Sequence, residues 1–298
     1  TQTISGVTTG KTFDITFGAA LTSLTTNNLS SGSDSMNFTL RGDLSGGARA
    51  FGTVTTPGVE TMTINTVDTN ATFTARLATI TVVDTDLSAL TLTGNNGVAL
   101  THAGVALTTL DASGITTGGF TFTSGILTTD SSATGSLTGN DTINLGAATS
   151  LVTITETAGT NALTGSATNK STITGGSGID TIVGGALVDT INVGAGTTTN
   201  TVLGAAGADV ITLTGSFGAD TIQYNLKATH QSATGANVDN ITGFAAGTDK
   251  ISLQHSTGAG TVLTGVTLDG TGDAVATMAA VVADVTSVAT IAEVYTDL

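Results

Sequence analysis

The 298-residue chain carries 22 acidic and only 7 basic side chains, a formal net charge of −15, and the basic residues form no cluster. This balance excludes a nucleic-acid-binding footprint and disfavours docking onto anionic lipid, and the absence of cysteine excludes thiol catalysis and cysteine-ligated zinc. Glycine (40 residues), threonine (roughly a fifth of the chain) and small or β-branched aliphatics dominate, which favours β-strands over disorder.

The first 135 residues are rich in threonine and alternate threonine with aliphatic residues. This period-two pattern predicts strands with one buried face. The clearest examples are residues 61–65, 78–82, 89–93, 107–110 and 120–122. Clusters of turn-forming residues at 94–97 and 112–114 separate them at intervals typical of a solenoid. We therefore expect a Thr-rich β-solenoid region over residues 1–135.

A nonapeptide repeat follows in the second half. Residues 175–183 read Gly-Gly-Ser-Gly-Ile-Asp-Thr-Ile-Val, a full match to the pattern G-G-x-G-x-D-x-U-x, in which U is aliphatic. Residues 184–192, 204–212 and 215–223 are partial copies, and residues 139–143 keep a fragment of it.

The spacing of these copies defines two interleaved series. The pattern "Asp or Asn, any residue, aliphatic" recurs about every twenty residues. The first series consists of Asp141, Asn161, Asp180, Asn200, Asp220 and Asp239. The second is offset by half a period and consists of Ser171, Asp189 and Asp209. Two series at half-period offset predict a flattened spiral in which strands alternate with turns and the turns stack in two columns.

Stacked turns of this composition predict bound cations. Glycines at the first, second and fourth positions permit a sharp turn, and the eighth-position aliphatic enters a narrow core between two parallel sheets. Stacking also brings the sixth-position carboxylates of successive turns together, so their repulsion requires a cation between them. Ligands made only of carboxylate and carbonyl oxygens select a hard ion, and Ca²⁺ tolerates irregular geometry better than Mg²⁺.

Residues 136–253 resemble the calcium-binding β-roll of RTX proteins. Residues 238–253 are also similar to the D-x-I-x-x-F-x-x-G-x-D-x-I-x-L end of the roll in type I secreted proteins, including serralysin-like proteases. The expected fold is therefore all-β: a right-handed parallel β-roll or β-helix solenoid with calcium-binding nonapeptide turns over 136–253, preceded by the Thr-rich region. Residues 254–298 are expected to form a C-terminal extension that is helical in part over residues 273–298 and leads toward a type I secretion signal outside this sequence.

The resemblance implies that several calcium ions lie between successive turns of one column. One site would use Gly185, Leu187 and Asp189 with Gly204, Ala206 and Asp209. Another would use Gly176, Gly178 and Asp180 with Ala195, Thr197 and Asn200. The implied metal set also includes Gly215, Phe217 and Asp220 and, at the ends of the roll, Asp141 and Asp239. Because Asn161, Asn200 and Ser171 carry no charge, we expect some of these sites to be weak or empty, and Asp249 is expected to cap the terminal turn.

Residues 58–65 and 107–114 are similar to segments of RTX-type S-layer proteins of Gram-negative bacteria. The chain as a whole then resembles the C-terminal part of such a protein. This resemblance implies a non-enzymatic structural subunit that is secreted by a type I system, folds in extracellular calcium and self-associates into a lattice on the cell surface. Lipopolysaccharide or another surface glycan would anchor it through other regions, with no insertion into the membrane and no nucleic acid partner.

Two other functions stay open from the sequence. The chain could be the non-catalytic RTX tail of a secreted protease or lipase, or an RTX adhesin whose regular threonine faces bind glycans or ice. The three histidines, His102, His230 and His255, are far apart and form no H-E-x-x-H motif, and no serine lies in a G-x-S-x-G elbow. The sequence therefore predicts no catalytic residues, and no histidine is expected to bind a metal.

Overall fold

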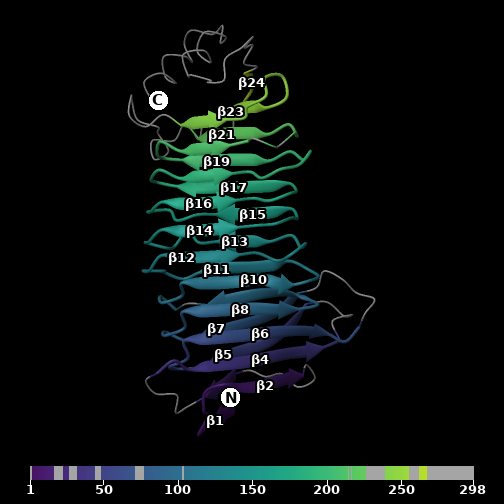
Figure 1. The fold of residues 1–298 in the computed structure, drawn as a ribbon, viewed down its shortest axis with the longest axis vertical. Helices are drawn as coiled ribbons and strands as arrows, with labels where there is room; N and C mark the ends of the chain where they lie inside the picture. Colours follow the sequence, from purple (N-terminus) through teal and green to yellow (C-terminus); the bar gives the residue numbers. More distant parts are fainter. Residues whose placement is uncertain are drawn as a thin grey trace.

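The computed structural model describes residues 2–16, 23–26, 32–43, 48–70, 77–102, 104–213, 215, 217–225, 239–254 and 262–266. All regular elements in these ranges are β-strands, and together they form two sheets that run beside each other along the long axis of the molecule (Figure 1). Successive coils of the chain stack along this axis. The expected all-β solenoid is therefore confirmed. Within the described residues, no helix is long and apolar enough to span a bilayer.

Sheet 1 contains the odd-numbered strands and the terminal β24. Its strands, in spatial order, are β1 (Gln2–Ile4), β3 (Ser23–Thr26), β5 (Arg49–Thr55), β7 (Leu77–Val83), β9 (Gly97–His102), β11 (Phe120–Ser124), β13 (Thr142–Asn144), β15 (Asn161–Thr164), β17 (Asp180–Gly185), β19 (Thr201–Ala205), β21 (Thr221–Asn225), β23 (Lys250–Gln254) and β24 (Val262–Val266). All neighbours pair in parallel except β23 and β24, which are antiparallel.

Sheet 2 contains the even-numbered strands, so the chain changes sheet after each strand up to β23. Its strands, in spatial order, are β2 (Lys11–Thr16), β4 (Ser35–Gly42), β6 (Thr61–Asp68), β8 (Ala89–Gly94), β10 (Thr109–Ile115), β12 (Ser131–Thr134), β14 (Val152–Thr155), β16 (Ser171–Thr174), β18 (Thr190–Asn192), β20 (Val210–Thr212) and β22 (Asn240–Thr242). Each strand pairs with the strand two places along the chain, which is the connectivity of a parallel solenoid.

The length of one coil changes along the stack. In sheet 2, Met36 pairs with Met62 and Met62 with Leu90, steps of 26 and 28 residues. From β7 to β21 the steps are shorter, about twenty residues, as when Leu77 pairs with Gly97 and Thr142 with Ala162, and they lengthen again after β20, where Val210 pairs with Asn240. The period expected from the repeat is thus confirmed, and the longer strands lie at the purple and blue end of Figure 1.

The strands expected in the Thr-rich region are present. Four of the five predicted segments coincide with β6, β7, β8 and β11, while the fifth is displaced because β10 begins at Thr109. The prediction of a turn at residues 112–114 was wrong, because these residues lie within β10, where the pairing with β8 shifts between Asp111 and Gly114. A β-bulge accommodates extra residues without ending the strand. A Gly-containing cluster in the sequence can therefore indicate either a turn or a bulge.

The core lies between the two sheets and narrows along the stack. In the wide coils it contains Phe38, Phe51 and Phe120, all at most 2% exposed. From β12 onward the centre of the core is formed by two columns of mostly aliphatic side chains in register, one from each sheet, with Val152, Val193 and Leu213 also buried. The sheet 1 column is Ile143, Leu163, Ile182, Val202, Ile222 and Ile251, and the sheet 2 column is Ala133, Ile154, Ile173, Ile191, Ile211 and Ile241. These are the eighth-position residues of the repeat, and they are buried as expected.

Truncation of one such side chain should destabilise the stack far more than truncation of its outward neighbour. Ile182 is fully buried and Thr181 is exposed. We expect Ile182→Ala to lower the free energy of unfolding by roughly 2–5 kcal/mol, because it removes buried apolar surface and leaves a cavity. Thr181→Ala should change it by less than about 0.5 kcal/mol. Urea unfolding measures both, and similar losses would contradict a core limited to the inward column.

Candidate functional site

The sixth-position Asp and Asn residues lie in two columns of turns. We call the turns that lead into sheet 1 the first column and those that lead into sheet 2 the second column. Most of these side chains are buried where the turn meets its strand; Asp180, Asp189, Asp209 and Asp220 are fully buried, whereas Asp239 is partly exposed.

In the first column, successive turns are joined by a ladder of hydrogen bonds. The backbone N–H of each Asp or Asn donates to the Oδ1 atom of the corresponding residue one turn further on. The bonds run from Asp141 to Asn161 (2.9 Å), Asn161 to Asp180 (3.2 Å), Asp180 to Asn200 (2.8 Å), Asn200 to Asp220 (2.8 Å) and Asp220 to Asp249 (3.0 Å). The stacking inferred from the first series is therefore present, with charged and neutral side chains alternating as far as Asp220.

The second column forms the same ladder. Backbone N–H groups donate from Ser171 to Asp189 (2.6 Å), from Asp189 to Asp209 (2.8 Å) and from Asp209 to Asp239 (2.9 Å). The assignment of Asp239 to the first series was therefore wrong. The coil after β20 is longer than twenty residues, since Val210 pairs with Asn240, and this shifts Asp239 into the second column. In the first column, Asp249 takes the position after Asp220 that was expected for Asp239.

The second carboxylate oxygens of these aspartates are poorly satisfied. Asp180, Asp209 and Asp220 each have a buried Oδ2 atom with no hydrogen-bond donor. In Asp189, Oδ2 accepts only the N–H of Gly185, at 2.5 Å. A buried anionic oxygen without a partner is costly, so each of these positions requires a proton or a cation.

The pKa values of these aspartates also show that burial disfavours their charged form. Burial raises the pKa of Asp180 and of Asp189 to about 6. For Asp209, burial and then the carboxylates of Asp239 and Asp189 raise the pKa to about 7. At Asp209 the repulsion therefore comes from carboxylates on the turns to either side, because the second column places carboxylates on consecutive turns.

Glycines leave room where these oxygens converge. A Cβ atom on Gly175 would lie 2.6 Å from Asp180 Oδ2 and 2.9 Å from the Val193 carbonyl oxygen of the next turn. A Cβ atom on Gly184 would lie 2.4 Å from Asp189 Oδ2 and 2.5 Å from the Gly204 carbonyl oxygen. Carboxylate and carbonyl oxygens from two successive turns thus face one small space, and this donor set suits a hard divalent cation.

The implied ligands are brought together only in part. Gly204 faces Asp189 as expected, whereas the carbonyl oxygen of Gly185 accepts the N–H of Ala206 at 2.9 Å. In the other set, Val193 lies against Gly175 in place of the expected Ala195, because the turn before Asn200 is longer than nonapeptide spacing assumes.

The remaining residues whose carbonyl oxygens were expected to bind calcium do not face the buried carboxylates. Thr197 is exposed, Phe217 is 79% exposed, and the carbonyl oxygen of Gly178 accepts a hydrogen bond from Thr198 Oγ1. Among the described residues, no three His, Cys, Asp or Glu side chains converge as a metal centre. Any cation in these columns would therefore depend on main-chain oxygens as well as carboxylates.

The conformations of Gly176 and Gly178 fit the repeat. Their φ angles are +82° and +143°, values that residues with a side chain rarely adopt. Ala205, which pairs with Gly185 at the second position of a later turn, has a φ of +74° and is the one described non-glycine residue with positive φ. A positive φ is thus adopted at the second position by Gly176 and Ala205 but not by Gly185, and Ala205 adopts it at a cost.

The sequence interpretation missed Glu156. This residue occupies the first position of the turn that leads into β15, where the repeat has glycine, and it is 3% exposed with no donor to either side-chain oxygen. A signal was available, because the only glutamate between residues 61 and 292 stands five residues before the neutral Asn161.

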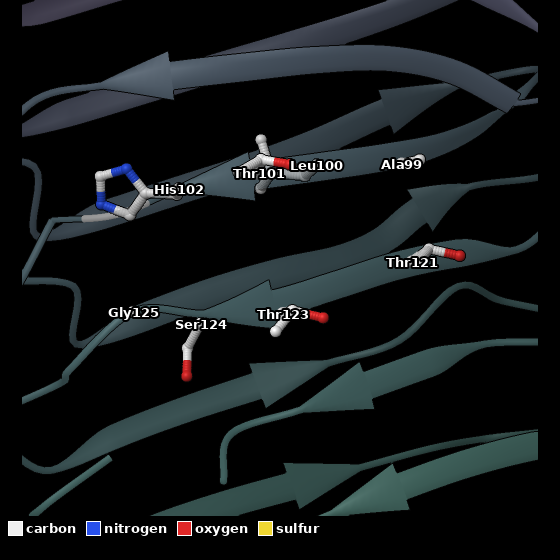
Figure 2. A pocket seen from close by; sticks show the side chains of 8 residues that line it. All are labelled: Ala99, Leu100, Thr101, His102, Thr121, Thr123, Ser124 and Gly125. Carbon is white, nitrogen blue, oxygen red and sulfur yellow. The ribbon is translucent and has the colours of Figure 1, made fainter. Parts of the chain in front are cut away.

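A separate groove lies on sheet 1 between β9 and β11 (Figure 2). It is lined by Ala99, Leu100, Thr101, His102, Thr121, Thr123, Ser124 and Gly125. His102 is buried, which lowers its pKa, and its Nδ1 atom lies 3.2 Å from the carbonyl oxygen of Val82. His230 and His255 lie outside the described residues.

Comparison with known proteins gives no family for this chain: no family model matches, and no curated protein or solved structure matches it either. The class of molecule is thus defined by its fold, a parallel β-solenoid with two columns of buried Asp and Asn residues.

The raised pKa values predict how the stability of the metal-free protein depends on pH. The ordinary pKa of Asp is 3.8, so between about pH 4 and pH 7 the folded state binds more protons than the unfolded state. After chelation and dialysis, we expect the free energy of unfolding to fall as the pH rises through this window, and to fall less steeply in Asp209→Asn. Urea titrations at pH 4.5 to 8 measure this, and a stability that rises with pH would contradict it.

Proposed function

We propose that the solenoid binds calcium between successive turns and that calcium is required for its folding outside the cell. The observation that supports this is the set of fully buried carboxylate oxygens without donors on Asp180, Asp209 and Asp220. A divalent cation bound beside these oxygens would compensate their buried negative charge. Extracellular calcium modules bind at about 10⁻⁴–10⁻³ M, so such a chain would stay unfolded in the low-calcium cytosol and fold after export.

We further propose that the folded chain is a structural subunit of a bacterial surface layer, secreted by a type I system. The resemblance of its sequence to RTX-type S-layer proteins supports this role. So do the outer faces of the solenoid, which are regular and carry few charges. On sheet 2, Thr153, Thr172 and Thr190 are aligned in one outward column, and Thr134, Thr155 and Thr174 in another. Flat polar faces with this repeat suit side-by-side packing of copies, and calcium would lower the repulsion that a net charge of −15 causes.

The calcium assignment is tested by removing two neighbouring carboxylates. We expect Asp189→Asn with Asp209→Asn to reduce the number of calcium ions bound and to abolish most of the calcium-dependent rise in melting temperature. The matched control is Asp86→Asn with Asp111→Asn, which changes charge equally at two residues that are not fully buried, outside the columns. Isothermal titration calorimetry and melting in calcium or EGTA give the two readouts. Equal effects of the two double variants would rule out the assignment.

The surface-layer role is tested by electron microscopy of the purified chain. We expect two-dimensional arrays to form when calcium is raised to millimolar concentration and to dissolve when it is chelated. Monomers that persist in calcium would contradict a lattice function. Glycan-array binding or ice shaping by those monomers would then support the alternative of an adhesin that uses the threonine columns.

A further inference from the structure

The turn that leads into β15 departs from the repeat at its first, second and sixth positions, and the changes at the first and sixth positions involve carboxylates. Its first position stacks between Gly135 and Gly175, as shown by equivalent backbone hydrogen bonds from Gly135, Glu156 and Gly175 to the next strand of sheet 2. At this position the turn has Glu156 in place of glycine. At the sixth position it has the neutral Asn161 in place of aspartate. One carboxylate has therefore been lost from the sixth position and one gained at the first.

The Glu156 side chain enters the space above Gly135. A Cβ atom on Gly135 would lie 1.9 and 2.1 Å from the two carboxylate oxygens of Glu156, so the carboxylate occupies the space that a side chain at position 135 would take. This space corresponds to those at Gly175 and Gly184, where an Asp oxygen and a carbonyl oxygen converge. Here the carboxylate of the next turn fills it.

The surroundings of Glu156 are acidic. Its carboxylate interacts with that of Asp141 and, more weakly, with that of Asp180, and both raise its pKa. Neither oxygen of Glu156 has a donor. Asp141 already accepts the backbone N–H groups of Phe120 and Ser136 and the Ser136 hydroxyl, so it is held in place beside Glu156. Two neighbouring buried carboxyl groups with no donor between them must share either a proton or a cation.

We propose that Glu156 is a ligand of a divalent cation that it holds together with Asp141, between the turns that lead into β13 and β15. This site rests on the proposed calcium function and differs from the other sites because its second carboxylate comes from the first position of a turn. Glu156 thus supplies the charge that Asn161 lacks, and the remaining oxygen ligands come from the main chain and water. In the metal-free protein, burial and then Asp141 raise the pKa of Glu156 to about 10, so a proton takes the place of the cation.

The first test counts bound calcium in Glu156→Gln. We expect this variant to bind about one ion fewer per chain than the wild type in equilibrium dialysis against calcium, while its circular dichroism in calcium stays that of a β-protein. Glu60→Gln is the control, because Glu60 lies in the Thr-rich region and accepts the N–H of Asp34, a role that glutamine keeps. An unchanged ion count in Glu156→Gln would overturn the proposal and leave Glu156 as a protonated buried group.

A second test does not depend on the folding of that variant. Glu156→Gly with Asn161→Asp moves the carboxylate back to the position it has in the other turns. We expect this double variant to bind as many ions as the wild type, because the site keeps its charge. If Glu156 were only a protonated group, the double variant would gain one ion over the wild type, which would overturn the proposal. Wild-type protein that binds no calcium at all would instead refute the proposed function itself.

Discussion

The structure depends on the burial of acidic side chains in register. Parallel strands lie about 4.8 Å apart, and two unit charges at that distance repel by roughly 3 kcal/mol at an effective dielectric constant of about 20. The second column places Asp189, Asp209 and Asp239 on consecutive turns, and the two neighbouring carboxylates add to burial in raising the pKa of Asp209. The same Oδ1 atoms that join the turns by hydrogen bonds thus bring together charges that water cannot screen. Folding and charge compensation are therefore one problem in this molecule.

The two halves of the stack solve this problem differently. In the wide coils, the buried Asp84 accepts hydrogen bonds from the Thr56 hydroxyl and from the N–H groups of Val59 and Asp86, so protein donors satisfy it. A wide core with aromatic residues such as Phe38 and Phe120 supplies apolar burial there. In the coils from β12 onward, the core is mostly aliphatic and the turns leave the carboxylate oxygens of Asp180, Asp209 and Asp220 without donors. The narrow half is thus the part whose stability should depend on ions.

The sequence predicted the parts of the fold that repeat. A period of about twenty with alternating aliphatic residues requires two parallel sheets and two columns of turns, and both are present. It failed where a coil changes length, because the long coil after β20 moves Asp239 into the other column and the long turn before Asn200 brings Val193 beneath Gly175. Insertions of this kind leave no mark on a motif of nine residues. Glu156 was missed for a different reason: it breaks the pattern, and a search for matches does not register a residue that replaces the expected glycine.

The central claim is that cations compensate the buried carboxylates of the two columns. A crystal structure of the chain grown in millimolar calcium, with anomalous scattering used to locate the ions, tests it most directly. The account predicts density for calcium beside Asp180 and between the turns of Asp189 and Asp209, within coordination distance of their carboxylate oxygens. Turns that stack in the same register with only water or protein atoms at these positions would contradict it.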